Sequence, residues 1–264
     1  MEYQILDRTS FKAFLGLSTG DKVPDEKTVW LFRERLTKTG LVEELFEQFT
    51  SFLEEQALIF NEGRLIDASC TVAPRQRNTK DENKTIKEGK GDDVCNDKPT
   101  KKRHKDIDAR WTKNNGERFY GYKNHAKVDT KSKFIKKYVV TDASVHDSQA
   151  LDDVLEDQDQ ELYADSAYTG QGQDKTIAKD EMKNKVHEKG YRNQPLTQQQ
   201  KANNTEQSKI RARVEHVFGF MEQSMKALTL KSVGIVRATG IIGLINLTYN
   251  LFRYEQVKRL KITY

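Results

Sequence analysis

Apolar residues recur at three- and four-residue steps through the first sixty positions, the spacing of one face of an α-helix. The clearest case is the segment 41–55, where glutamates fill the positions between the apolar ones. Pro24 precedes another such segment, and proline fits the first turn of a helix. Residues 1–62 are therefore expected to form an all-helical region. The apolar positions of the clearest helix are Leu41, Val42, Leu45, Phe46, Phe49, Phe52 and Leu53.

The pattern changes after residue 62. Residues 63–70 form a short apolar run, and residues 118–128 alternate with a period of two. A turn at 130–132 leads to another run at 134–140, which predicts a hairpin. Between the first run and the hairpin, residues 71–110 are hydrophilic and contain no aromatic residue, so a long basic loop is expected there. The sequence thus predicts an α/β domain over 63–264, with a loop insertion at about 71–110.

Three carboxylates stand out within this predicted domain. Asp67 and Asp165 each come where a short apolar run gives way to small residues, and Glu215 lies on an amphipathic helix. A carboxylate at a strand end is exposed at the rim of a sheet, where ligands of open α/β folds bind. Three such side chains would suit Mg²⁺ or Mn²⁺. The alternative is that each aspartate is a turn residue and that Glu215 forms a surface salt bridge with Arg211, four residues earlier.

Charge is distributed unevenly around these carboxylates. The net charge is +5, but residues 71–137 hold 20 Lys and Arg against 10 Asp and Glu, and residues 201–264 hold 11 against 4. Residues 141–165 hold nine acids and no Lys or Arg. Basic regions that flank an acidic one suit a polyanionic partner, although a lysine-rich surface also serves solubility. The candidate contacts to DNA are Lys101, Lys102, Arg103, Lys105, Lys123, Arg211 and Arg213.

The remaining features of the sequence bear on the cellular compartment in which the protein is expected. Two cysteines, Cys70 and Cys95, make neither a disulfide framework nor a metal motif. The polar start of the chain does not resemble a signal peptide. The longest apolar stretch, 240–252, is interrupted by Asn246 and Asn250 and is expected to be too short to span a bilayer. A reducing cytoplasm without membrane attachment is the simplest expectation.

Taken together and in order, the motifs resemble those of the Asp-Asp-Glu (DDE) transposases of bacterial insertion sequences, in particular the insertion-sequence-five family. The resemblance covers nearly the whole chain. It rests on Phe14-Leu-Gly-Leu, Val23-Pro-Asp-Glu-Lys-Thr, Leu65-Ile-Asp-Ala-Ser, Asp108-Ala-Arg-Trp-Thr-Lys, Tyr120-Gly-Tyr-Lys-Asn-His, Val145-His-Asp-Ser, Ala164-Asp-Ser-Ala-Tyr and Arg211-Ala-Arg-Val-Glu-His-Val-Phe-Gly.

This resemblance implies a ribonuclease-H-like fold, a mixed sheet flanked by helices. It places Asp67 on the central first strand, Asp165 beside it and Glu215 on a packing helix. It also implies that the three carboxylates hold two Mg²⁺ ions, with Mn²⁺ as a substitute, for cleavage and strand transfer at the ends of a mobile element. The implied partners are double-stranded DNA and further copies of the chain, in a bacterial cytoplasm at the nucleoid.

Two departures from the family pattern leave other functions open. Ser208 and Glu222 stand where the family has a tyrosine and a basic residue, and the helical region before Phe14 is expected to be shortened. The alternatives are a non-transposing DNA-binding regulator of a related element and another ribonuclease-H-like nuclease. His125 and His146 also lie in family-like motifs, and a structural hydrogen-bonding role is expected for both.

Overall fold

The computed structural model describes residues 1–264 except 61, 77, 115, 158, 169–181 and 264. A mixed sheet lies at its centre, and the strand order is β2-β3-β1-β5-β6, with β4 paired to β3. β1 is antiparallel to β3 and parallel to β5, so it is an interior strand. The strands are β1 (Arg64–Val72), β2 (Arg110–Asn114), β3 (Glu117–Asp129), β4 (Ile135–Asp142), β5 (Glu161–Tyr163) and β6 (Lys183–Asn184).

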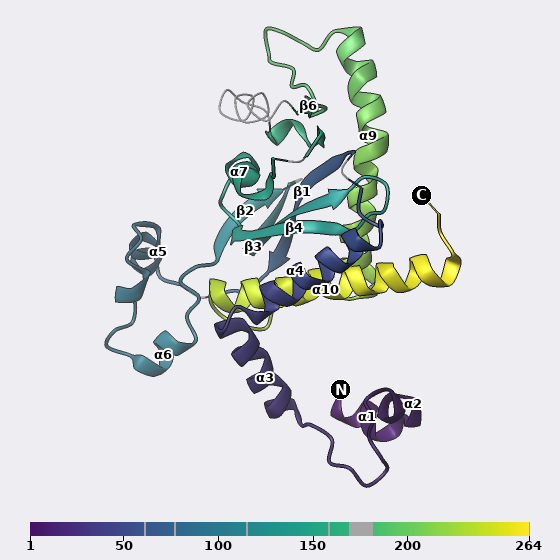
Figure 1. Cartoon of the computed structure of the whole chain (residues 1–264). Helices are drawn as coiled ribbons and strands as arrows, with labels where there is room; N and C mark the ends of the chain where they lie inside the picture. The colour runs from purple at the N-terminus through teal and green to yellow at the C-terminus, as the bar shows by residue number, and fades with distance from the viewer. Residues whose placement is uncertain (61, 77, 115, 158, 169–181, 264) are drawn as a thin grey trace.

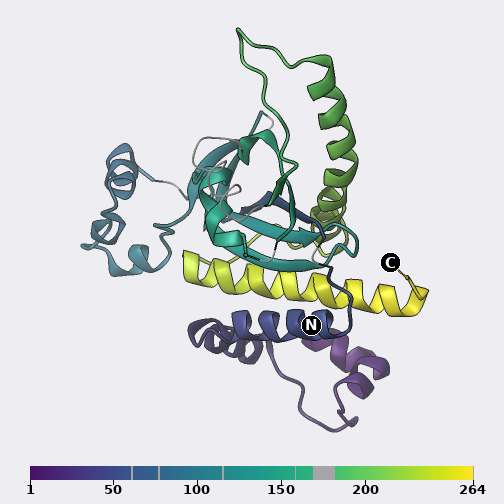
Figure 2. The ribbon, with the colours of Figure 1, turned by 45° about the horizontal axis from the view of Figure 1, so that its top comes forward.

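Helices cover both faces of this sheet. Leu65 and Val128 face one side, where they pack with Val214 and Val217 of α9 (Gln198–Gly219). Ile66 faces the other side, where it packs with Leu151 of α7 (Leu151–Val154). Successive residues of a strand point to opposite faces, which explains this division. α10 (Ile235–Leu260) lies along the sheet on the α9 side, and α4 (Leu41–Glu55) runs beside it (Figures 1 and 2).

The helical character expected of the N-terminal region is confirmed. The structure has α1 (Glu2–Asp7), α2 (Thr9–Phe14), α3 (Glu26–Lys38) and α4, and the bounds of α4 agree with the periodic segment. α3 begins at Asp25, whose carboxylate accepts a hydrogen bond from the Thr28 backbone NH at 2.7 Å. Both α3 and α4 pack against α10. The division into domains at residue 62 stays a prediction.

α10 is longer than the apolar stretch that the sequence marked out. It has 26 residues and, among the described helices, is the one long and apolar enough to cross a membrane by length and composition alone, a test that the core helix of a protein also passes. Its polar residues Asn246 and Asn250 face inward. Asn246 exchanges side-chain hydrogen bonds with Asn124 of β3 at 2.8 and 3.2 Å, and Asn250 bonds both backbone groups of Ile135. These buried bonds fix the helix against the sheet.

The region 71–110 is not a structureless loop, so the expectation of a long loop there is wrong. It contains α5 (Lys80–Lys87), a short turn of helix η1 (Gly91–Asp93) and α6 (Pro99–Arg103), which project from the sheet (Figure 1). Glu82 organises them. Its carboxylate lies 2.7 Å from Lys101 Nζ and 3.0 Å from Lys105 Nζ, and it completes a capping box with Thr79. Ion pairs and a cap thus supply order where little apolar area is buried.

A buried group of charges holds the start of β1. Arg64 pairs with Asp129 of β3 and with Asp159 before β5, each at 2.9 Å, and all three side chains are inaccessible to solvent. Asp159 also lies 2.6 Å from Nζ of the buried Lys127. Each buried cation therefore has a carboxylate partner, as the cost of removing charge from water requires.

Replacing Asp159 by Asn should lower the free energy of unfolding by about 3 kcal/mol. The buried cations Arg64 and Lys127 would both lose the carboxylate that they contact. Urea unfolding measures this change. Glu255→Gln is the control, since its pair with Arg259 is more than half exposed, and it should cost less than about 0.5 kcal/mol. Equal effects of the two substitutions would contradict the structural role given to the buried group.

Candidate active site

Strand register brings the two aspartates together. Leu65 of β1 lies opposite Tyr163 of the parallel strand β5. Asp67 comes two residues later within β1, so it shares the sheet face of Leu65, and the expectation that it ends its strand is wrong. Asp165 comes two residues after Tyr163, beyond the end of β5, as expected of a strand-end residue. That face is the one covered by α9. The predicted proximity of these two residues therefore follows from a pairing between strands almost a hundred residues apart.

Arg211 of α9 bridges the two carboxylates. Its terminal nitrogen Nη2 lies 3.8 Å from Asp67 Oδ2 and 3.9 Å from Asp165 Oδ2. The side chains of Arg211 and Asp67 are 16% and 23% exposed, and that of Asp165 is 48% exposed. Each aspartate also accepts a hydrogen bond from the next backbone NH, of Ala68 and of Ser166. The pair thus sits at the solvent edge of the sheet, with one positive charge between two negative ones.

The environment of Asp67 favours its protonated form. Burial raises the pKa of Asp67 to about 6, and the charges of Asp165 and Asp147 act in the same direction. The Ala68 NH and Arg211 oppose the rise without cancelling it. A carboxylate that is costly to keep ionised gains from a bound cation, and carboxylate oxygens are the ligands that Mg²⁺ and Mn²⁺ prefer. The pair therefore fits a divalent metal ion.

Glu215 is placed differently. It lies on α9 one turn beyond Arg211, and its side chain is exposed. Across the described ranges, no three His, Cys, Asp or Glu side chains are grouped closely enough to hold a metal ion. Nor is an ion pair found between Arg211 and Glu215 in that part of the chain, where Arg211 pairs with the two aspartates instead. The role of Glu215 as a third ligand stays a prediction.

Two residues beside the pair were not singled out from the sequence. His187 lies with Nδ1 3.3 Å from Arg211 Nη1 and Nε2 3.3 Å from Ser208 Oγ. Burial and the charge of Arg211 lower the pKa of His187. Tyr168 is buried, and its hydroxyl has no hydrogen-bond partner among the described residues. Burial raises the pKa of Tyr168, and the negative charges of Asp67, Asp147 and Asp165 act in the same direction. The motif Ala164-Asp-Ser-Ala-Tyr contained the signal for Tyr168.

The two histidines of family-like motifs make structural bonds. His125 is buried on β3 and contacts Thr141 Oγ1 through Nε2 at 2.9 Å, and burial lowers its pKa to about 4. His146 Nδ1 lies 2.8 Å from Ser148 Oγ and accepts a hydrogen bond from the Ser148 NH, so it caps the short helix η2 (Asp147–Ala150). The hydrogen bonds are those expected of a structural role.

The candidate DNA contacts occupy varied surroundings. Lys101 and Lys105 pair with Glu82, and Lys102 donates to Asn96. Lys123 turns inward, where its Nζ contacts Asp147 Oδ1 at 2.8 Å. Arg213 donates to the Thr130 carbonyl, Arg211 bridges the aspartates, and Arg103 lies at the end of α6. Their binding to DNA stays a prediction.

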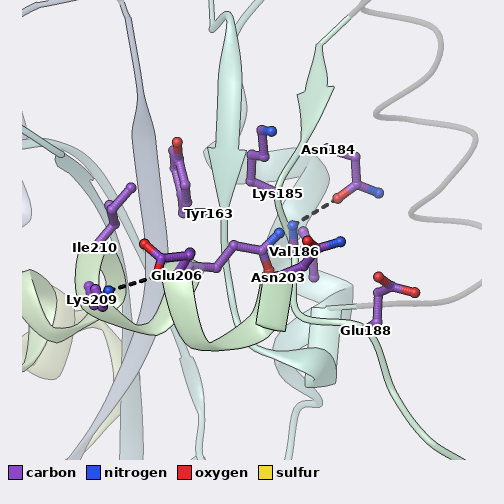
Figure 3. A pocket seen from close by; sticks show the side chains of 10 residues that line it. Tyr163, Asn184, Lys185, Val186, Glu188, Asn203, Glu206, Lys209 and Ile210 are labelled. Carbon is purple, nitrogen blue, oxygen red and sulfur yellow. Dashed lines mark hydrogen bonds and ion pairs between the residues drawn. The ribbon is translucent and has the colours of Figure 1, made fainter. Parts of the chain in front are cut away.

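A groove of about 760 Å³ lies between α9 and the segment that contains β6 (Figure 3). β6 and the segment after it form one wall, and α9 forms the other. Tyr163 and Ile210, which lie in this lining, are two residues and one residue before Asp165 and Arg211. Lysines and glutamates alternate along the groove, so its charge is balanced. Its remaining lining is Asn184, Lys185, Val186, Glu188, Asn203, Glu206, Gln207 and Lys209.

Comparison with known families agrees with this arrangement. The family model described as Transposase DDE domain matches residues 60–251, and a second, described as Transposase domain (DUF772), matches residues 1–35. No solved structure matches the chain significantly. The first match spans most of the sequence and contains Asp67, Asp165 and Glu215. The chain belongs to the DDE-domain transposases, and its mixed sheet flanked by helices is the ribonuclease-H-like fold of that family.

The raised pKa of Asp67 predicts a pH-dependent stability. Between about pH 4 and pH 6 the folded state retains a proton that the unfolded state has lost, so wild-type stability falls as pH rises through this window. Asp67→Asn stays neutral throughout. Its stability relative to wild type should therefore increase by about 2 kcal/mol from pH 4 to pH 7.

Denaturant unfolding in EDTA at several pH values measures this difference, because groups common to both proteins cancel. Asp152→Asn, on exposed α7 surface, is the control and should show no such trend. A wild-type-to-variant difference that is flat between pH 4 and pH 7 would contradict the assigned environment of Asp67.

Proposed function

We propose that the protein cleaves and joins DNA at the ends of an insertion sequence, with divalent metal ions held by Asp67, Asp165 and Glu215. The observation that carries this proposal is that Asp67 of β1 and Asp165, two residues after β5, lie 3.8 and 3.9 Å from Arg211, on a helix that also carries Glu215. Family membership supports a transposase, and DDE transposases generally depend on divalent metals. Action on double-stranded DNA as a homo-oligomer in a bacterial cytoplasm is part of the proposal.

The three carboxylates would hold two Mg²⁺ ions, which would supply activation of a water molecule and stabilisation of the leaving 3′ oxygen. In strand transfer, the freed 3′-hydroxyl of the element would attack a phosphate of the target DNA and displace the 3′ oxygen of the target strand. The protein supplies charge and position rather than a covalent nucleophile. Asp67 is ionised at neutral pH, because its pKa of about 6 lies below 7, and it is ready to accept a cation.

Arg211 has a part in the same process. Its guanidinium neutralises the aspartate pair and lies where a cation between the carboxylates is attracted. A cation held by the two carboxylates would take the place of the guanidinium charge, and Arg211 would then be available beside the pair. A guanidinium there can contact a DNA phosphate through two parallel hydrogen bonds. His187 Nδ1 lies 3.3 Å from Arg211 Nη1, and this contact would restrict the side-chain conformations of the released arginine.

Glu215 completes the proposed ligand set by a change of side-chain conformation. It is exposed and lies four residues after Arg211, so both side chains project from the same side of α9. The neighbouring Val214 and Val217 are buried in the core, which fixes the helix itself. A flexible side chain on a fixed helix can reach the pair once Arg211 is released.

Glu215→Gln keeps the shape of the side chain and removes its charge. We expect the variant to retain binding to the element's ends and to lose Mg²⁺-dependent nicking at least ~10²-fold, the usual effect of removing a catalytic electrostatic group. The assay uses a plasmid that carries those ends, with Mg²⁺ or EDTA. Mn²⁺ affinity, measured by electron paramagnetic resonance, should fall in parallel.

Glu222→Gln is the matched control, because Glu222 is also exposed, two turns further along the chain. It should nick like the wild type. Equal nicking by the wild type and by Glu215→Gln would remove Glu215 from the site.

A non-transposing DNA-binding regulator is the second candidate. The sequence motivates it in one respect, since Ser208 stands in place of the family's tyrosine; its hydroxyl contacts Asn204 O and His187. This function predicts that the wild-type protein binds the element's ends and does not cut them in Mg²⁺ or Mn²⁺.

A further inference from the structure

We propose that a second surface, formed by the β3–β4 turn with α9 and α10, binds a single-stranded segment of DNA. This inference rests on the proposed function for its DNA partner, but it concerns residues outside the carboxylate site. The surface, here called the turn pocket, is a hollow of about 510 Å³. Its lining includes Lys133, His216, Phe220, Tyr249, Phe252 and Arg253.

Positive charges converge on the β3–β4 turn. Arg213 of α9 donates to the Thr130 carbonyl, and Arg253 of α10 donates to the Ser132 carbonyl at 2.9 Å. Lys133, the next residue of the turn, places its Nζ 3.0 Å from His216 Nδ1. The two guanidiniums therefore hold backbone oxygens of a turn that itself presents a lysine.

This crowding has an electrostatic cost. The positive charges of Arg253 and Arg213 act with burial to lower the pKa of Lys133. Glu255, an acid in the lining, is engaged with Arg259 Nε at 2.7 Å. An anion that entered the pocket would relieve the repulsion among the cations. Phosphate oxygens meet this need without precise geometry, because backbone charge dominates the affinity of proteins for nucleic acids.

Aromatic rings adjoin the cations. Phe220 of the turn η4 (Phe220–Ser224) packs edge-to-face with Phe252 at 5.6 Å and with Tyr249 at 5.9 Å between ring centroids. Tyr249 donates its hydroxyl proton to the Lys133 carbonyl at 3.0 Å, which joins the rings to the turn. Phe252 nevertheless remains 52% exposed. Its ring is thus held in place and offers surface to solvent.

An exposed aromatic ring beside a phosphate-binding cluster favours single-stranded DNA over duplex DNA. Bases in a duplex are stacked on each other and cannot stack on a side chain, whereas unpaired bases can. The turn pocket therefore fits a single strand, with a phosphate at Lys133 and a base against Phe252. His216 follows Arg211 by five residues, or about 7.5 Å along α9, which places the turn pocket close to the carboxylate pair.

The test measures binding of a fluorescein-labelled 12-nucleotide single strand and of the corresponding duplex to the full chain, in EDTA. Phe252→Ala should weaken single-strand binding about 10-fold and change duplex binding less than 2-fold, as expected for loss of one stacking contact. Leu251→Ala is the control, since Leu251 is 47% exposed on the same helix, and it should change neither.

A second substitution tests the proposed contact between Lys133 and a DNA phosphate. Lys133→Gln should lower the slope of log affinity against log salt by about 0.7 for the single strand. Lys131→Gln, in the same turn and paired with Glu62, should leave the slope unchanged.

Each outcome decides one point. If Phe252→Ala weakens single strand and duplex equally, or no more than Leu251→Ala does, the stacking role is wrong. An unchanged salt slope for Lys133→Gln rejects the phosphate contact. Wild-type protein that binds neither DNA would instead count against the proposed function, whereas intact duplex binding and nicking with unaffected variants would count against the turn pocket alone.

Discussion

The buried pairing of Arg64 with Asp129 and Asp159 is the interaction on which the geometry of the carboxylate site depends. Arg64 is the first residue of β1, and its two partners belong to β3 and to the segment before β5, the two neighbours of β1 in the sheet. Separating any of these buried charges from its partner would cost several kcal/mol of folding free energy. The pairs therefore fix the register of β1 relative to β3 and to the segment before β5. A shift of β1 by one residue would turn Asp67 to the opposite face of the sheet.

The same constraint explains why two aspartates far apart in sequence become one site. Asp67 lies three residues after Arg64, and Asp165 follows the end of the neighbouring strand β5 by two residues. α9 then closes that face through Val214 and Val217, which brings Arg211 between the carboxylates. Further along α9, Arg213 and His216 contribute to the turn pocket. One helix therefore connects the carboxylate pair with the turn pocket.

Much of this could be predicted from the sequence. The period of α4, the hairpin of β3 and β4 and the position of Asp165 just after a strand all follow from local patterns of apolar residues. The continuation of β1 beyond Asp67 does not, because the residues after it are small and polar. The order of α5 and α6 could not, because it rests on Glu82 and its distant lysine partners instead of apolar periodicity. The contact of His187 with Arg211 could not be predicted either, since it depends on how the chain after β6 packs against α9. The buried asparagines of α10 interrupt its apolar pattern, and their bonds to the sheet depend on tertiary contacts that this pattern does not contain.

Anomalous diffraction from crystals soaked in Mn²⁺ tests most directly whether the aligned carboxylates form a metal centre. We expect a Mn²⁺ peak between Asp67 and Asp165, with Arg211 moved away from both and Glu215 turned toward the ion. A saturating soak that leaves Arg211 bridging the two aspartates, with Mn²⁺ peaks elsewhere or none, would contradict it.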